Sequence, residues 1–176
     1  MIKTITTNIK ELRKPCELVN KDDKEIKSII QDLKDTLNSF SAKAIGLSAN
    51  QIGINKRISY IKIPRFMNQN KEMQYDEYIL INAKIIEKDR PIQVKNESCL
   101  SFPGVGVITR RYVFVTVEYL DENFKSQINA FQDLPAICVQ HEIDHLDGRL
   151  ILDRSGWKRK LEIMWTIRRL KKEKLW

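Results

Sequence analysis

One stretch of the sequence, residues 133–148, reads DLPAICVQHEIDHLDG. Asp133 suits the cap of a helix, Pro135 its first turn and Gly148 its end, so the stretch predicts a helix over about 134–147. A spacing of four places His141 and His145 one turn apart on one face, where a single metal ion can reach both imidazoles. The protein's only two histidines lie in this motif, which favours a metal site over two unrelated structural histidines.

The segment before this helix predicts one further helix and several strands. A helix over about 22–40 is indicated by a capping-box pattern at Asp22 and Glu25 and by apolar residues at the helical period, Ile26, Ile29, Ile30, Leu33 and Leu37. Alternating and β-branched residues predict strands over 58–63, 78–86, 113–119 and 124–131, with a hairpin turn at 121–123.

The order of these elements indicates the fold class. Ser155 is a candidate cap for a third helix that runs toward the C-terminus. Strands flanked by helices, without regular alternation, indicate an α+β fold. We expect antiparallel and mixed β-sheets around the central metal-binding helix, with an N-terminal and a C-terminal helix.

Length and composition indicate an ordinary globular protein. The chain has 176 residues, 42% of them hydrophobic and 31% charged, which predicts one domain: a body over 1–154 and a basic C-terminal helix over 155–176 that belongs to it. No segment approaches the roughly 18 apolar residues of a membrane span, and residues 1–14 do not resemble a secretory signal. Three cysteines are too few for a disulfide framework. We therefore expect a cytoplasmic protein without a membrane partner.

The positive charge is concentrated at the C-terminus. Residues 154–176 carry nine Lys and Arg against Glu162 and Glu173, a net charge of +7 out of +8 for the chain. This concentration indicates either a polyanionic partner, nucleic acid above all, or the solvated face of a terminal helix. Four apolar residues are expected to dock this helix onto the body: Trp157, Leu161, Met164 and Trp165.

The histidine motif indicates metal-assisted hydrolysis. Glu142 lies next to the first histidine and could contact a metal-bound water. A catalytic site of this kind needs a third protein ligand, and the sequence holds no third histidine. A later acid such as Glu162 is one alternative, but cysteine is the better candidate: Cys16, Cys138 or Cys99, the last in the polar loop ESCLSFPG over 97–104.

Three segments together resemble the peptide deformylase family. They are GLSANQIG at 46–53, ESCLS at 97–101 and QHEIDHLDG at 140–148, and the resemblance extends over roughly residues 10–155. It implies an enzyme that hydrolyses the formyl group from the N-terminal formylmethionine of newly made polypeptides and releases formate.

The resemblance also implies the roles of individual residues. Cys99, His141 and His145 would hold one divalent metal ion, Fe(II) in the cell, with Zn, Ni or Co as other ions that such ligands accept. Metal-bound water would attack the formyl carbon, with Glu142 as general base and then general acid. Two donors, the Gln51 side chain and the Leu100 backbone N–H, would stabilise the charge on the formyl oxygen.

Further residues would bind the substrate or support the site. The family pattern places the substrate against Ile45, Gly46, Leu134, Ile137 and Cys138. The alternative for Leu134 and Ile137 is plain core packing. Glu97 would pair with Arg111 to brace the cysteine loop. Asp144 is either a support for a ligand or a solvent-facing helix residue.

Three residues depart from the family pattern. Ala44 and Ser48 stand where Gly and Ala are usual, and Ser98 replaces the usual Gly before the cysteine. If position 98 required a positive φ, Ser98 would cost about 1 kcal/mol or more. No ligand, base or oxyanion position changes, so activity is expected.

Two other functions remain as alternatives. A peptidase with the same histidine motif would need another third ligand and would cleave internal peptide bonds. A binder without catalytic activity would use its basic tail to sit on ribosomal RNA. For the deformylase, the expected partners are N-formylmethionyl peptides and, through the basic helix, the ribosome; DNA is not expected.

Overall fold

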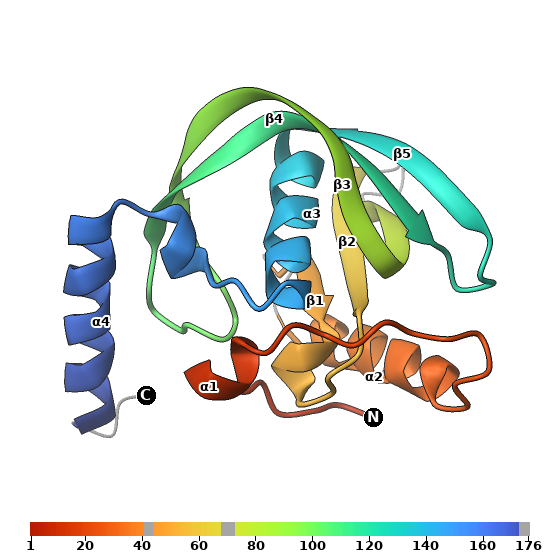
Figure 1. Cartoon of the computed structure of the whole chain (residues 1–176), viewed down its shortest axis with the longest axis horizontal. Helices are drawn as coiled ribbons and strands as arrows, with labels where there is room; N and C mark the ends of the chain where they lie inside the picture. The colour runs from red at the N-terminus through yellow and green to blue at the C-terminus, as the bar shows by residue number, and fades with distance from the viewer. Residues whose placement is uncertain (41–43, 68–72, 173–176) are drawn as a thin grey trace.

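The structure is a computed structural model that describes residues 1–40, 44–67 and 73–172 (Figure 1). Its helices are α1 (Ile9–Leu12), α2 (Ile26–Asn38), α3 (Asp133–Leu146) and α4 (Trp157–Lys172), with short 3₁₀ turns η1 (Ala49–Ile52) and η2 (Ile151–Arg154). Its strands are β1 (Gly46–Ser48), β2 (Ile58–Met67), β3 (Met73–Glu97), β4 (Val107–Leu120) and β5 (Ser126–Gln132).

The described strands form one antiparallel sheet in the order β1-β2-β3-β4-β5. The expectation of several sheets, some of them mixed, was wrong. Each strand pairs with the next one along the chain, and such neighbours run in opposite directions because short connections reverse the chain. The long β3–β4 pair has register shifts after Ile81, Ile85 and Val94. Such bulges increase bending, and in Figure 1 this pair curves over one end of α3.

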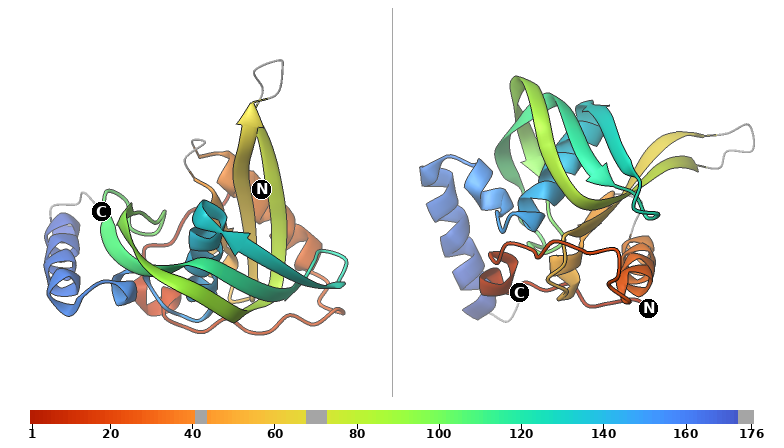
Figure 2. Two further views of the ribbon diagram at one scale, coloured as in Figure 1. Left: turned by 90° about the horizontal axis from the view of Figure 1, so that it is seen from above. Right: turned by 45° about the vertical axis from the view of Figure 1, so that its right-hand side comes forward.

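Helix α3 lies inside the molecule, between the curved sheet and the N-terminal segments (Figures 1 and 2). Every residue from Cys138 to Leu146 is buried. Its Ala136, Val139 and Ile143 pack with Val115 and Val117 of β4 in one core cluster, while α2 packs on β1 and β2 in a second cluster. Polar side chains on α3 are therefore held in the interior, where they need partners.

The ends of the helices differ from the predictions in detail. Helix α2 begins at Ile26, and neither Asp22 nor Glu25 caps it with a side chain. Gln132 precedes α3, so Asp133 is its first residue and not its cap. Gly148 follows the end of α3 with a φ of 69°, as expected for a glycine that terminates a helix. Ser155 donates to the Leu152 carbonyl at 2.8 Å, and α4 begins two residues after it, at Trp157.

Helix α4 docks on the body through a different face from the one expected. Ile163 and Ile167 are buried in a cluster with Leu12 of α1 and the turn at η2, and Met164 packs against this cluster. Trp157, Leu161 and Trp165 are 70%, 49% and 71% exposed and face outward. Of the four residues predicted to dock the helix, only Met164 packs against this cluster. Because Ile163 and Ile167 belong to a core cluster of the body, they support our proposal that the helix is part of the same domain. The predicted end of this helix, residues 173–176, lies outside the described residues.

No helix in the described part of the chain is long and apolar enough to span a bilayer.

Candidate active site

Helix α3 and the loop after β3 bring together the three predicted ligands. The His141 and His145 ring centroids are 5.0 Å apart, and the Cys99 Sγ lies 3.2 Å from His145 Nε2. One ligand atom from each residue lies within 4.8 Å of the others. The strand and the helix are far apart in sequence, so packing of the sheet on α3 creates this cluster.

The donor set fits one transition-metal ion. One sulfur and two imidazole nitrogens suit Fe(II) or Zn, with room for a non-protein ligand in a four-coordinate site. His141 Nδ1 is 2.7 Å from Glu97 Oε1, which leaves Nε2 for an ion, because such a bond fixes the tautomer of the ligand. Burial, together with His141 and Arg111, lowers the pKa of His145 well below its usual range. The lowered pKa favours the neutral imidazole, which is the form that binds a metal.

Glu97 connects His141 to a buried charge network. Arg111, which is 1% exposed, donates to both carboxylate oxygens of Glu97, at 3.0 and 2.6 Å. Burial alone would raise the pKa of Glu97, but hydrogen bonds with His141 and Arg111 outweigh it and hold the pKa far below its usual range. Glu97 is thus a permanent anion that orients the imidazole.

The same arginine reaches the middle of α3. Arg111 Nη1 donates to Asp144 Oδ2 at 2.5 Å, and Arg154 of η2 donates to the same oxygen through Nε at 2.8 Å. Asp144 is buried, so of the two interpretations left open for it, the solvent-facing one is wrong. Arg154 was not predicted to belong to the site, because no local sequence pattern shows that η2 folds back onto α3.

Glu142 lies beside the ligand cluster in a dry environment. It is 3% exposed, and its Oε2 accepts a hydrogen bond from Ser48 Oγ at 2.6 Å. Burial raises the pKa of Glu142, and His141 and the Ser48 bond partly offset this. A carboxyl whose pKa is raised toward neutrality is a better proton acceptor and donor for catalysis. The sequence reasoning noted Ser48 only as a departure from the family pattern.

Gln51 is held with its amide pointing at the cysteine loop. Its Oε1 accepts from the Ser48 backbone N–H at 2.9 Å, as part of a capping box at η1. Its Nε2 lies 3.6 Å from Cys99 Sγ and 3.2 Å from Ser101 Oγ. The amide donor thus lies beside the predicted ligand Cys99.

Ser98 has an ordinary backbone conformation. Ser98 is not among the described residues with a positive φ, whereas Asn96, near the end of β3, has a φ of 61°. A side chain at position 98 therefore costs no backbone strain, because the left-handed conformation that would need glycine lies two residues earlier.

A cavity of about 550 Å³ opens in front of this cluster. Its walls include the predicted substrate-binding and oxyanion residues Ile45, Gly46, Gln51, Leu100, Leu134, Ile137 and Cys138, together with Glu97, Cys99, His141 and Glu142. Leu134 is 47% exposed, so it forms part of the cavity mouth and is not core. Phe40 also lines the cavity. The sequence reasoning missed Phe40 because it lies at the end of the predicted helix over 22–40.

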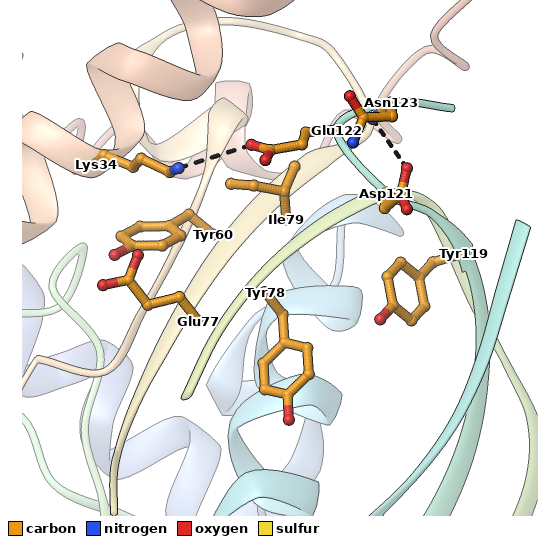
Figure 3. Close-up of a pocket in the computed structure, with 9 residues that line it drawn as sticks. All are labelled: Lys34, Tyr60, Glu77, Tyr78, Ile79, Tyr119, Asp121, Glu122 and Asn123. Atoms are coloured by element: carbon orange, nitrogen blue, oxygen red, sulfur yellow. Dashed lines mark hydrogen bonds and ion pairs between the residues drawn. The ribbon is translucent and has the colours of Figure 1, made fainter. Parts of the chain in front are cut away.

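A second cavity, of about 320 Å³, lies apart from this site (Figure 3). It is lined by Tyr60, Tyr78 and Tyr119 and by residues of the β4–β5 turn. Lys34 Nζ lies 3.7 Å from a carboxylate oxygen of Glu122 across the cavity. Asp121 accepts hydrogen bonds from the backbone N–H groups of Asn123 and Lys125, within the turn. The Lys34–Glu122 pair therefore joins the turn to α2, and Asp121 stabilises the turn itself.

The fold and the site define a class of protein, a metal-dependent hydrolase in which Cys99 and two helical histidines surround one position beside Glu142. Comparison with known proteins identifies the family. The family model for polypeptide deformylase matches residues 1–160. The chain is 37% identical over 153 residues to a peptide deformylase of Aquifex aeolicus, and the aligned region covers 86% of each chain.

Solved structures agree with this result. The crystal structure of peptide deformylase from Ehrlichia chaffeensis has a TM-score of 0.85, 30% identity and full coverage of both chains. A peptide deformylase from Acinetobacter baumannii with Met-Ala-Ser bound has a TM-score of 0.75 at 23% identity, over 88% of this chain and 98% of that one, which shows a shared fold. The chain belongs to the polypeptide deformylase family.

Proposed function

We propose that this protein removes the N-formyl group from the N-terminal formylmethionine of newly made polypeptides and releases formate. The observation that carries the proposal is that ligand atoms of Cys99, His141 and His145 lie within 4.8 Å of one another. The cavity beside them is lined by Glu142 and Gln51. Membership of the deformylase family agrees with this chemistry.

In the proposed reaction, Cys99, His141 and His145 would hold the ion. When bound, the ion supplies Lewis acidity to a water and to the formyl oxygen. Glu142 accepts a proton from the attacking water and returns it to the amine nitrogen as the C–N bond breaks. The Gln51 amide and the Leu100 backbone N–H donate to the formyl oxygen as negative charge develops there. The products are formate and a free N-terminal amine.

The substrate backbone would pair with β1. This strand forms one edge of the sheet, and the Ile45 carbonyl accepts from the Lys62 N–H at 2.9 Å, on the β2 side. Backbone groups alternate between the two sides of an antiparallel strand, so those of Gly46 face the open edge. An extended peptide can add there as a further strand, with its methionine side chain against Leu134, Ile137 and Cys138.

The bound metal in the cell is proposed to be Fe(II), with Zn, Ni or Co acceptable to the same ligands. Metal analysis of the protein purified under anaerobic conditions should give one ion per chain. Cys99→Ala should lose the ion, because two imidazoles alone leave the site one ligand short. Stoichiometric iron in the Cys99→Ala variant would contradict the ligand set.

Activity separates the proposed function from the peptidase alternative. The protein is incubated with formyl-Met-Ala-Ser and with Met-Ala-Ser, and formate and peptide fragments are measured separately. We expect formate without cleavage of either peptide bond, and a loss of about 10²- to 10⁴-fold in kcat for Glu142→Ala. Fragments without formate would support the peptidase, and an unchanged rate in Glu142→Ala would contradict the role of this carboxylate.

We also propose that the enzyme works in the cytoplasm, on chains that leave the ribosome, and that the basic C-terminal helix associates with the ribosome. Two facts support this: the net charge of +7 on residues 154–176 and the outward-facing Trp157, Leu161 and Trp165 on α4. The three cysteines are free thiols, as in a reducing compartment.

A further inference from the structure

Ser48 and Ser59 form a hydrogen-bonded pair that ends at the Glu142 carboxylate. The two residues are directly opposite each other in the β1–β2 ladder, and both are fully buried. Their Oγ atoms are 2.7 Å apart. Ser48 Oγ lies 2.6 Å from Glu142 Oε2 and 3.2 Å from the Glu142 carbonyl. The pair thus connects the edge of the sheet to the middle of α3.

The chemistry of the groups sets the direction of these bonds. An ionised carboxylate has no proton to donate, so the Ser48 hydroxyl donates to Glu142 Oε2. The hydroxyl has one proton, so in the Ser48–Ser59 contact the donor is Ser59. Hydrogen bonds to charged acceptors are short and strong, and here both hydroxyls are oriented toward one oxygen.

The other carboxylate oxygen of Glu142 is left on the cavity side. A Cβ added to Gly46 would overlap with Glu142 Oε1, so this oxygen packs directly on the backbone of the glycine. Both Gly46 and Glu142 line the substrate cavity. The two oxygens of one carboxylate therefore have different surroundings: a buried hydroxyl at Oε2 and the bare backbone of Gly46 at Oε1.

We propose that Ser48, supported by Ser59, is a positioning residue for the general base: it holds Oε2 and leaves Oε1 to carry the proton. The water O–H bond breaks with its proton moving to Oε1, and the same proton then passes from Oε1 to the amine nitrogen as the C–N bond breaks. The bond from Ser48 to Oε2 fixes the orientation of the carboxylate. This inference rests on the proposed role of Glu142.

Kinetics of four variants test the inference. Ser48→Ala should lower kcat about tenfold with KM within about twofold, because the base loses its orientation while the substrate contacts stay. Ser48→Cys, with a side chain of similar size and a weak donor, should fall between Ser48→Ala and the parent. Ser59→Ala should lose only about two- to threefold, since the Ser48–Glu142 bond survives. Ser155→Ala, which removes a hydroxyl far from the cavity, is the matched control and should equal the parent.

A double-mutant cycle separates positioning from a merely structural role. The Ser48→Ala change is repeated in the Glu142→Ala background, and residual formate release and the affinity for Met-Ala-Ser are measured at a temperature where thermal unfolding shows all variants folded. We expect no further loss in that background and unchanged peptide affinity.

Different failures point to different errors. Parent-like kcat in Ser48→Ala, with an inactive Glu142→Ala enzyme, overturns the positioning role and leaves the proposed function intact. An equal loss from Ser48→Ala in both backgrounds overturns it as well, because the hydroxyl would then act elsewhere. Full activity of Glu142→Ala overturns the general base itself.

Discussion

Among single residues, Arg111 supports the site through two buried ion pairs. It is buried to 1% exposure and pairs with two carboxylates, Glu97 and Asp144. Removing one partner of such a network leaves a charge in the interior without compensation, which is far more costly than losing a surface pair. Because Glu97 in turn holds His141, the orientation of one predicted metal ligand depends on a residue of β4.

A substitution at Gly46 tests whether catalysis depends on the close approach of β1 to the general base Glu142. Gly46→Ala should lower kcat about 100-fold, because the new Cβ would overlap with Glu142 Oε1 and lie 2.9 Å from Cys138 Sγ. The measurement is kcat for formyl-Met-Ala-Ser beside the melting temperature. Gly53→Ala is unsuitable as a control, because Gly53 has a φ of 81° and an alanine there would be strained. Gly156→Ala is the control and should leave kcat unchanged, because a Cβ at this position contacts no other atom. Normal kcat in Gly46→Ala would show that the carboxylate can move without penalty.

Among elements, the junction of α1, η2 and α4 is held by one carboxylate. Asp153 accepts from Arg13 at 2.9 and 3.1 Å, from Lys160 Nζ at 2.6 Å and from the Leu150 N–H at 2.9 Å. Burial would raise the pKa of Asp153, but these hydrogen bonds dominate and lower it far below its usual value. The aspartate therefore connects the C-terminal helix to the N-terminal segment.

This junction predicts a pH-dependent contribution to stability. The pKa of Asp153 is lower in the folded than in the unfolded chain, so its contribution is full above the unfolded value of about 3.9 and is lost as pH falls through the folded value. Asp153→Asn should lower the free energy of unfolding by about 1 to 2 kcal/mol at pH 7, and the difference should shrink below about pH 4. Urea unfolding of metal-free protein at both pH values measures it.

An exposed carboxylate provides the control for that experiment. Asp76 is 44% exposed and lies 3.6 Å from Arg65, so Asp76→Asn should change stability by less than about 0.5 kcal/mol at either pH. An Asp153→Asn variant as stable as the parent at pH 7 would show that the ion pairs only offset the cost of burying the carboxylate.

At the scale of the whole molecule, α4 combines a buried face with a strongly charged segment. Ile163 and Ile167 belong to the core, so deleting residues 154–176 would remove packing together with charge. Substitution is therefore a cleaner test of ribosome association than truncation.

Neutralising the tail should weaken ribosome binding without affecting catalysis. A variant with Lys158, Arg159, Arg168 and Arg169 all changed to Gln should sediment with ribosomes less than the parent, and the loss of binding with rising salt should become less steep, because fewer phosphates are contacted. Turnover of formyl-Met-Ala-Ser should stay within about twofold. The measurement is co-sedimentation at two salt concentrations.

The matched control removes equal charge elsewhere. Four lysines that are exposed in the structure, Lys21, Lys24, Lys27 and Lys95, are changed to Gln together. This variant should bind ribosomes nearly as well as the parent, since the proposed contact is local to the tail. Equal weakening in both variants would mean that only total charge matters, and salt-independent binding in the parent would reject the electrostatic contact.

Local chemistry explains which predictions from sequence were right. The spacing of His141 and His145, the stop at Gly148 and the turn at 121–123 depend on residues close in the chain, so helix period and turn preference were enough to predict them. The 25-residue length of β3 was underestimated, because charged and bulged positions after Ile86 break the alternation that predicts a strand.

Residue spacing and the family pattern were enough to predict the kind of chemistry: a helix that carries two imidazoles and a carboxylate, with a thiol from a separate loop. The orientation of these groups could not be predicted, because it depends on tertiary contacts. The bonds from Ser48 to Glu142 and from Arg154 to Asp144, and the outward turn of Trp157 and Trp165, join or separate elements distant in sequence. Such relations depend on how the sheet curves around α3, because packing and not local propensity sets the distance between two elements.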